Sequence, residues 1–330
     1  MNIKIIAKSI IVFLIIPFFV SLESKDLNFG NKPDQLKEVH IGAYIINITE
    51  INLIDQKFNA EFYIWFRWKG KDYNPIDHYT IVNGVIKEKV DKYIEEKENE
   101  EFYGYEKIQA QIYENFKMDD FPFDAHILEI KIEDSNEIEL IKFIPDIKNS
   151  QISSDIDFGG WGLDYFNTAE YINIYKTNYG DLSLPSFSES TYSQFNFSIY
   201  LKRVGVGYFF KLMVGVIIST LICILSFKIK PIHLDPRFGL SIGSLFGAVA
   251  SEYVVISSIP PTSVMTVADK IHILSFIIIL SSIAISTYSL KLFDENKIEK
   301  ANLLDKIAFR ISSIVYLVLI GFIIYLANFN

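Results

Sequence analysis

Four apolar stretches in the last third of the chain constrain its fold more than any other feature of the sequence. They cover residues 206–227, 238–258, 271–290 and 307–326. A helix rises about 1.5 Å per residue, so about 20 residues cross the hydrocarbon core of a bilayer, which is roughly 30 Å thick. The sequence therefore predicts four membrane-spanning helices at the C-terminal end of the chain.

A shorter apolar run lies between residues 10 and 20 and follows Lys4 and Lys8. Basic residues, a short apolar core and small polar residues after it are the layout of a secretory signal peptide. The alternative is an uncleaved membrane anchor, but the run is short for a span and contains Pro17. We expect a signal peptide at residues 1–24, an outer domain at 25–203 and a membrane domain at 204–330.

The short loops between the predicted helices are basic. Lys228, Lys230 and Arg237 lie between the first two helices. The cations around the last linker are Lys291, Lys297, Lys300, Lys306 and Arg310. Short cytoplasmic loops are enriched in Lys and Arg. This pattern predicts a multi-pass protein of the plasma (inner) membrane, with both chain ends and the large N-terminal domain outside the cytoplasm.

The outer domain is acidic. Residues 24–203 carry a net charge of −13, whereas residues 204–330 carry a net charge of +3. An acidic surface disfavours nucleic acid and concentrates cations, although solubility alone also explains the charge. The single cysteine, Cys223, falls in the first predicted helix. The outer domain therefore depends on an ordinary hydrophobic core, without disulfides.

Residues 38–203 alternate between apolar and polar side chains with the period of β-strands. In residues 58–68 the even positions are all apolar, and the odd positions, Tyr63 among them, form a second, more polar face. Further strands are expected at 39–46, 108–113, 125–132, 138–144, 169–175 and 195–202. Many short strands separated by turn residues predict a sandwich. The charged segment 87–101 is expected to be a polar loop or a short surface helix, since it lacks the spacing of a calcium-binding loop.

The second apolar stretch is a poor lipid-facing helix, because small residues, serines and Glu252 interrupt it. Three patterns overlap in it. Gly239, Gly243 and Gly247 form a small-xxx-small ladder typical of close helix packing. A stripe at helical spacing, which bare periodicity would select as the wet face, comprises Ser241, Ser244, Ala248, Ser251, Val255 and Ser258. The GLSIG match to a hydrolase motif is accidental, because a membrane helix supplies no strand-to-helix elbow.

Several segments together resemble the pentameric ligand-gated ion channels, the Cys-loop receptor superfamily. The first is FKMDDFPFDAHIL, residues 116–128, whose FPFD tetrad occupies residues 121–124. The others are SIYLKRVGVGYFF, at the junction with the first span, and IPPTSVMTVADK after the second. Arg237 and Pro260 flank the second span at a separation of 23. The resemblance covers nearly all of residues 35–330.

The sequence departs from the family in three places. Glu114 and Leu128 stand where the animal receptors have their bridged cysteines, which indicates a prokaryotic member. The first span lacks the proline common in the family. The linker at residues 293–304 is too short for a cytoplasmic domain.

The resemblance implies an all-β extracellular sandwich followed by an all-α four-helix transmembrane domain, assembled as a homopentamer around a central pore. It implies six pore-lining residues: Gly239, Gly243, Phe246, Ala250, Val254 and Ser257. Five Phe246 side chains would form a hydrophobic gate that closes by dewetting. The serine-rich stripe remains the competing choice for the wet face.

Charge selectivity is implied by the residues before the second span. Asp235 lies where an acidic ring favours cations in the family, whereas the adjacent Pro236 is also found near this point in anion-selective members. Monovalent cations are the expected permeant ions. Glu252 points toward a neighbouring helix in the family register; an ionisable residue within a span is functional by default, but a packing role is equally open.

The family binds agonists between adjacent outer domains, in a box of aromatic side chains. The implied ligand-binding residues are Tyr63, Tyr79, Asn136, Tyr179 and Tyr192. Such a box suits an ammonium ligand, and the agonist is expected to be a small molecule or an ion. Asp124, Arg203 and Pro260 are implied to couple the outer domain to the pore, together with the loop at residues 259–267.

Other classes of function fit less well. The five histidines have no metal-binding spacing and no catalytic constellation is evident, so we expect no enzyme, no cofactor and no metal site. The expected partners are identical subunits, the agonist and membrane lipid, without nucleic acid. A non-conducting membrane-anchored sensor or binding receptor is the alternative, although it would not need the sparse second span. A transporter is disfavoured, because the sequence shows neither the broken helices nor the inverted repeats of that class.

Overall fold

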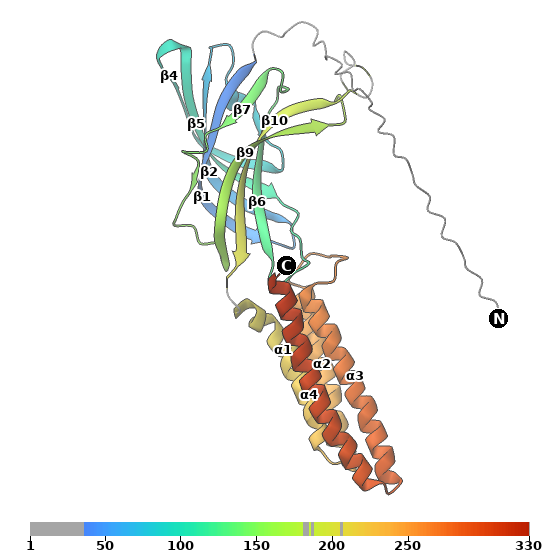
Figure 1. Cartoon of the computed structure of the whole chain (residues 1–330). Helices are drawn as coiled ribbons and strands as arrows, with labels where there is room; N and C mark the ends of the chain where they lie inside the picture. The colour runs from blue at the N-terminus through green and yellow to red at the C-terminus, as the bar shows by residue number, and fades with distance from the viewer. Residues whose placement is uncertain (1–35, 181–184, 186–187, 205–206, 330) are drawn as a thin grey trace, which may run out of the picture. The chain divides into compact units, whose positions relative to one another are not determined.

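The computed structural model describes residues 36–180, 185, 188–204 and 207–329. The predicted signal peptide at residues 1–24 lies outside the described residues, as does the predicted start of the outer domain. Within them, β-strands occupy the N-terminal part of the chain and four long helices the C-terminal part (Figure 1). The prediction of a β-rich domain followed by four helices is therefore confirmed.

Two sheets form the β-rich domain. The first has the order β4-β5-β2-β1-β7, with β8 also pairing with β1. Its strands are β1 (Lys37–Asn52), β2 (Lys57–Lys69), β4 (Gly84–Glu96), β5 (Glu101–Tyr113), β7 (Ile141–Pro145) and β8 (Gln151–Ile152). The second has the order β3-β6-β10-β9, from β3 (Tyr79–Ile81), β6 (Ala125–Asp134), β10 (Ser190–Arg203) and β9 (Trp161–Tyr175). Pairing is antiparallel except where β7 and β8 run parallel to β1.

The core of this domain follows from strand alternation. The even positions of β2, including Phe58, Phe62 and Phe66, are fully buried. On β10 the side chains of Phe195 and Phe197 are likewise buried, and both sets belong to one hydrophobic cluster. Burying a large apolar side chain stabilises a fold by about 1.5–3 kcal/mol. The two sheets thus form the sandwich-like arrangement that the period of two predicts.

The prediction of a loop or short helix at residues 87–101 is wrong. Most of this segment is β4, which pairs with β5 from Gly84 opposite Ile112 to Glu96 opposite Phe102. Pairing with β5 satisfies the backbone of β4, so its charged side chains need no apolar partner. Because β4 is an edge strand, those charges also oppose pairing with further strands. The expected strand at 138–144 begins later, at Ile141, because a turn precedes it.

The helices are α1 (Gly207–Leu225), α2 (Leu234–Ile256), α3 (Val267–Asp294) and α4 (Ile298–Phe329). All four are long and apolar enough to cross a membrane. Within the bundle α1 packs against α2, α2 against α3 and α3 against α4 (Figure 1). A capping box between Thr266 and Asp269 fixes the start of α3. The helices therefore form one bundle whose inner faces bury Ser and Thr together with apolar residues such as Met213, Ile271 and Ile279.

Candidate functional site

Helix α2 has two distinct faces within one chain. Its buried residues are Arg237, Ser241, Ser244, Ala248, Ser251 and Val255. The opposite side is open, and its largest side chains, Phe246 and Tyr253, are 70% and 73% exposed. Buried and exposed positions alternate at helical spacing, so α2 presents one long face to its own bundle and leaves another without contacts from this chain.

The six residues predicted to line a pore all lie on the open side of α2 or just after it. Gly239, Gly243, Phe246, Ala250, Val254 and Ser257 are all exposed. A β-carbon placed on Gly239 or Gly243 would meet no atom within 4 Å. These positions are therefore available to solvent, lipid or another subunit.

The packing within one chain shows where the serine stripe and the glycine ladder of α2 lie. The serine stripe faces the bundle: Ser251 donates to the Leu212 carbonyl on α1 at 3.4 Å and lies 3.3 Å from Nε2 of His272 on α3. The bundle buries five of the six stripe residues, all but Ser258, so the alternative in which this stripe forms the wet face is not supported. In the glycine ladder, only Gly247 packs closely, because a β-carbon there would collide with Ser219 of α1. Glu252 is half-buried.

The β-rich domain meets the bundle at a buried carboxylate, Asp124. Arg203, at the end of β10, donates to it from Nε at 2.6 Å and from Nη2 at 3.4 Å. Nε2 of His126 lies 2.7 Å from the same carboxylate. Burial alone would raise the pKa of Asp124, but hydrogen bonds and positive charge from His126 and Arg203 outweigh it and hold the pKa below its usual value. Asp124 and Arg203, both predicted coupling residues, are thus in direct contact.

Aromatic rings enclose the same cluster. The guanidinium of Arg203 lies 4.1 Å from the ring centroids of both Trp161 on β9 and Tyr208 on α1. Phe123 stacks on Phe209 of α1 with centroids 5.1 Å apart. Cation–π contacts of a partly desolvated Arg are worth about 1–2 kcal/mol each. The FPFD segment and the end of β10 are therefore fastened to the start of α1.

The same segment also contacts α3. The backbone amide of Ala268 donates to the Phe121 carbonyl at 3.1 Å. Pro260, the third predicted coupling residue, is buried in the loop between α2 and α3. A hollow of about 540 Å³ lies beside this junction, and its lining includes Glu50, Trp161, Arg203, Tyr208 and Ser258. Movement of the FPFD segment would thus act on α1 and on the start of α3 together.

Two of the predicted ligand-binding tyrosines gather around a third that the sequence did not single out. Tyr179 and Tyr192 pack edge-on against Tyr175 of β9, with ring centroids 5.9 and 5.7 Å away. The Tyr175 hydroxyl donates to Glu133 of β6, at 3.1 and 3.2 Å from its two oxygens. Burial and the Glu133 carboxylate raise the pKa of Tyr175 to about 12. These rings therefore form an aromatic cluster beside a carboxylate.

The Glu133 carboxylate is only 5% exposed although it lies on the outer face of its sheet. It also accepts hydrogen bonds from Asn173 at 2.8 Å and from Gln194 at 2.6 Å. Strands β6, β9 and β10 each supply part of this network. An anionic group held beside three tyrosines is a suitable environment for a cation.

The other predicted ligand residues lie elsewhere. Tyr79 is only 8% exposed, and its hydroxyl donates to the buried Glu106 at 2.7 Å, so its placement is that of a core residue and does not support contact with a ligand. Asn136 donates twice to Asp134, at 2.8 Å each. Tyr63 lies on β2 in the other sheet, edge-on to Tyr105 at 5.7 Å. Tyr63 and the Tyr175 cluster are therefore not brought together within one sheet.

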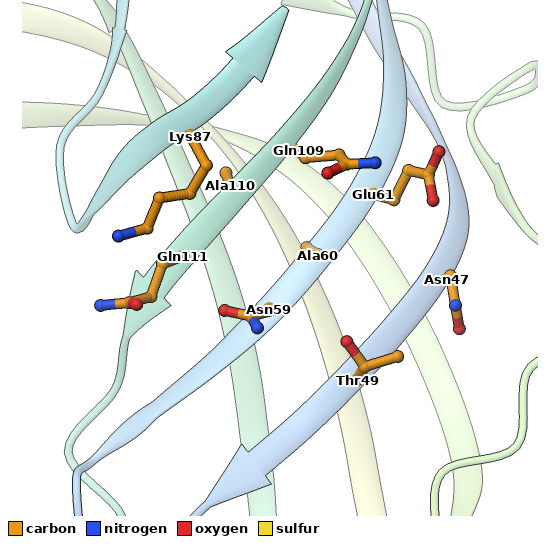
Figure 2. Close-up of a pocket in the computed structure, with 9 residues that line it drawn as sticks. All are labelled: Asn47, Thr49, Asn59, Ala60, Glu61, Lys87, Gln109, Ala110 and Gln111. Atoms are coloured by element: carbon orange, nitrogen blue, oxygen red, sulfur yellow. The ribbon is translucent and has the colours of Figure 1, made fainter. Parts of the chain in front are cut away.

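A second hollow, of about 260 Å³, lies on the solvent face of the first sheet. Figure 2 shows its lining, Asn47, Thr49, Asn59, Ala60, Glu61, Lys87, Gln109, Ala110 and Gln111, on neighbouring strands. The lining is dominated by neutral amides. Several are already engaged: Asn59 donates to Glu50 at 2.6 Å, and Glu61 pairs with Lys107 at 2.7 Å. Among the described residues, no group of three His, Cys, Asp or Glu side chains is arranged to hold a metal ion.

Sequence reasoning missed several residues at these sites. His126 lies two positions after Asp124, which directly precedes β6, and the period of two along an extended chain could have indicated that both point the same way. Glu133 and Tyr175 meet only through the sheet pairing, since 42 residues separate them. Asp305, the partner of Arg237, lies 68 residues from it. No local pattern signals either of these distant pairs.

No model of a known protein family matches the chain, and no curated protein matches it. The resemblance to pentameric ligand-gated ion channels therefore rests on the residues that carry it: the FPFD tetrad, the spacing from Arg237 to Pro260, and the order of β-rich domain and spans. The structure agrees with that order of elements.

Proposed function

We propose that this protein is a ligand-gated ion channel, in which five identical chains surround a pore lined by α2. A small molecule or ion binds between neighbouring outer domains. Phe246 forms the hydrophobic gate, and Asp235 favours cations.

The observation that carries this proposal is the division of α2 into a bundle-facing and an open side. The open side combines glycines, Ala250 and Ser257 with large residues such as Phe246. Large aliphatic residues such as Ile242, Val249 and Ile256 are also exposed on α2, but a helix that faces lipid throughout would carry them at the glycine positions as well. A face with glycine at two of its positions instead suits contact with water and with neighbouring copies of α2.

Ligand control is supported by the placement of the tyrosines. The Tyr175 cluster lies on the second sheet and Tyr63 on the first, so one chain cannot close an aromatic box from both. Two adjacent chains can, if the second sheet of one faces the first sheet of the next. The cluster with Glu133 would attract an ammonium group or another small cation.

Gating requires the ligand to bind the open state more tightly than the closed state. The Asp124–Arg203 cluster offers a mechanical link, because it joins β6 and β10 to α1 while Phe121 holds the start of α3. A shift of β10 caused by ligand binding would pull on both helices next to α2. Packed interfaces of this kind move between discrete arrangements.

Current recordings test the proposal directly. Purified full-length protein is reconstituted in planar bilayers and screened with ammonium compounds, amino acids and pH steps. We expect ligand-dependent single-channel currents that are carried by cations. Ligand binding without any current would overturn the channel and would instead support the non-conducting membrane sensor.

A further inference from the structure

Arg237, in the first turn of α2, is the largest fully buried side chain of the described residues. Its guanidinium forms a two-point contact with Asp305 of α4, Nη1 to Oδ2 at 2.9 Å and Nη2 to Oδ1 at 2.6 Å. Nε donates to Ser286 of α3 at 3.0 Å, and Nη1 donates to the Ile229 carbonyl at 3.3 Å. Residues from two other helices and one loop thus hold this single cation.

The contacts orient Arg237 away from the open side of α2. Arg237 lies on the same face as Ser241 and Ser244, which are buried in the bundle. Asp305 is itself only 5% exposed, so the two charges neutralise each other out of contact with water. A two-point guanidinium–carboxylate pair is the strongest geometry available for this purpose. An arginine cannot lose its proton in a protein, so only a fixed anion can cancel its charge here.

Asp235 lies two residues earlier and has the opposite environment. Its side chain is exposed, and among the described residues no ion pair involves it. A nearby cation, Lys228, lies 4.0 Å from the ring of Phe309 on α4, away from the open side of α2. Lys230, in the loop before α2, is also exposed. Within the first turn of α2 itself, Asp235 is the one charge left once that of Arg237 is cancelled.

We propose that Asp305 determines charge selectivity by neutralising Arg237 inside the bundle. This inference rests on the proposed channel function. In a ring of five chains, five Asp235 carboxylates would surround the pore entrance while five Arg237 charges remain cancelled by Asp305. Removal of the Asp305 charge would leave five permanent cations close to that ring, in a medium that screens them weakly. They would oppose the attraction of Asp235 for cations.

The test compares four proteins in the same bilayers under a sodium chloride gradient, with reversal potentials as the readout. They are the unchanged protein, Asp305→Asn, the double variant Arg237→Gln/Asp305→Asn, and the control Glu299→Gln. Glu299 is an exposed carboxylate on the same helix. We expect Asp305→Asn to lower the sodium-to-chloride permeability ratio at least about tenfold, the change that 1.4 kcal/mol produces. The double variant and the control should keep the ratio of the unchanged protein.

Each outcome bears on a different claim. If Asp305→Asn conducts with an unchanged ratio, the inference is overturned while the channel stands. If Asp305→Asn fails to assemble, the double variant can still overturn the inference, because neutral Gln and Asn can replace the pair by hydrogen bonds. A changed permeability ratio in the double variant would show that the charges of Arg237 and Asp305 do not cancel, and it would overturn the inference. If the unchanged protein carries no current, the proposed function itself fails.

Discussion

Asp124 holds Arg203, the residue whose guanidinium contacts Tyr208 at the start of α1. Its side chain is 1% exposed, and it serves both Arg203 and His126. Breaking a buried ion pair costs more than the pair contributes, because the remaining charge is left without a partner. Asp124 therefore combines a structural role with the predicted coupling role.

We expect Asp124→Asn to lower the free energy of unfolding at pH 7 by about 3 kcal/mol, since it leaves the Arg203 charge buried and unpaired. The pKa of Asp124 is lowered in the folded protein, so its charged form stabilises the fold above the unfolded-state pKa, about 3.9. This stabilisation is lost as the pH falls through the lowered folded-state pKa. Thermal unfolding of the unchanged protein and of Asp124→Asn between pH 7 and pH 3 measures this loss.

Asp72→Asn is the matched control for this series. The Asp72 side chain is 75% exposed in its pair with Lys37, and exposed pairs contribute little to stability. Its melting temperature should equal that of the unchanged protein at pH 7. A gap between Asp124→Asn and the unchanged protein that stays constant down to pH 3 would rule out the ionised carboxylate as the source of stability.

Phe246 is the residue on which the proposed gate depends. It is 70% exposed in one chain, so its ring is not held by its own bundle. We expect Phe246→Ser to raise the open fraction without ligand at least about tenfold, because a small hydroxyl group removes the barrier to wetting. Bilayer recordings measure it. Leu245→Ser, at the adjacent position on another side of α2, should change the open fraction little; equal effects of the two would contradict the gate.

Among the helices and strands, the periodicity of the sequence predicted those that bury an apolar face or span. The strand β2 followed from strict alternation, and the four helices followed from their apolar length. The strand β4 could not be predicted, because an edge strand that exposes Lys and Glu on its surface has no apolar period. Its conformation is set by pairing with β5.

The site was predictable only in part, for the same reason. The FPFD motif indicated Asp124, and the position just before the first span indicated Arg203. The two residues are in contact. The partners Glu133 and Asp305 are single acidic residues in unremarkable surroundings, and only the fold brings them to Tyr175 and Arg237. The burial of Tyr79 likewise depends on how the sheets pack, which no local pattern encodes.

The glycines of α2 offer a test of its two faces. Gly247→Leu should lower the free energy of unfolding by about 1–3 kcal/mol, because the new side chain collides with Ser219 of α1. Gly243→Leu gains the same helix propensity, and a β-carbon at position 243 meets no atom within 4 Å in one chain. We therefore expect Gly243→Leu to remain stable and to reduce single-channel current by narrowing the pore. Equal thermal stability of the two variants would contradict the assignment of faces.

For the whole molecule, the central question is what covers the open side of α2 and closes the aromatic box. In the proposed channel, a second copy of the chain in the same orientation does both. A head-to-tail contact, in which one surface meets a different surface of the next copy, closes into a ring when the rotation permits. The Tyr63 and Tyr175 surfaces lie on different sheets and so fit this kind of contact.

Cross-linking distinguishes such a ring from a two-fold dimer. Tyr63→Cys and Tyr192→Cys are introduced together in a Cys223→Ser background, which removes the single native cysteine. A short bismaleimide added to the membrane-embedded protein should then link each chain to the next, because in the proposed ring the two positions face each other between neighbours. We expect a gel ladder that ends at five chains, and no ladder from either single-cysteine variant. A ladder that stops at two chains would mean that the two surfaces do not meet around a ring, and α2 would then have no pore to line.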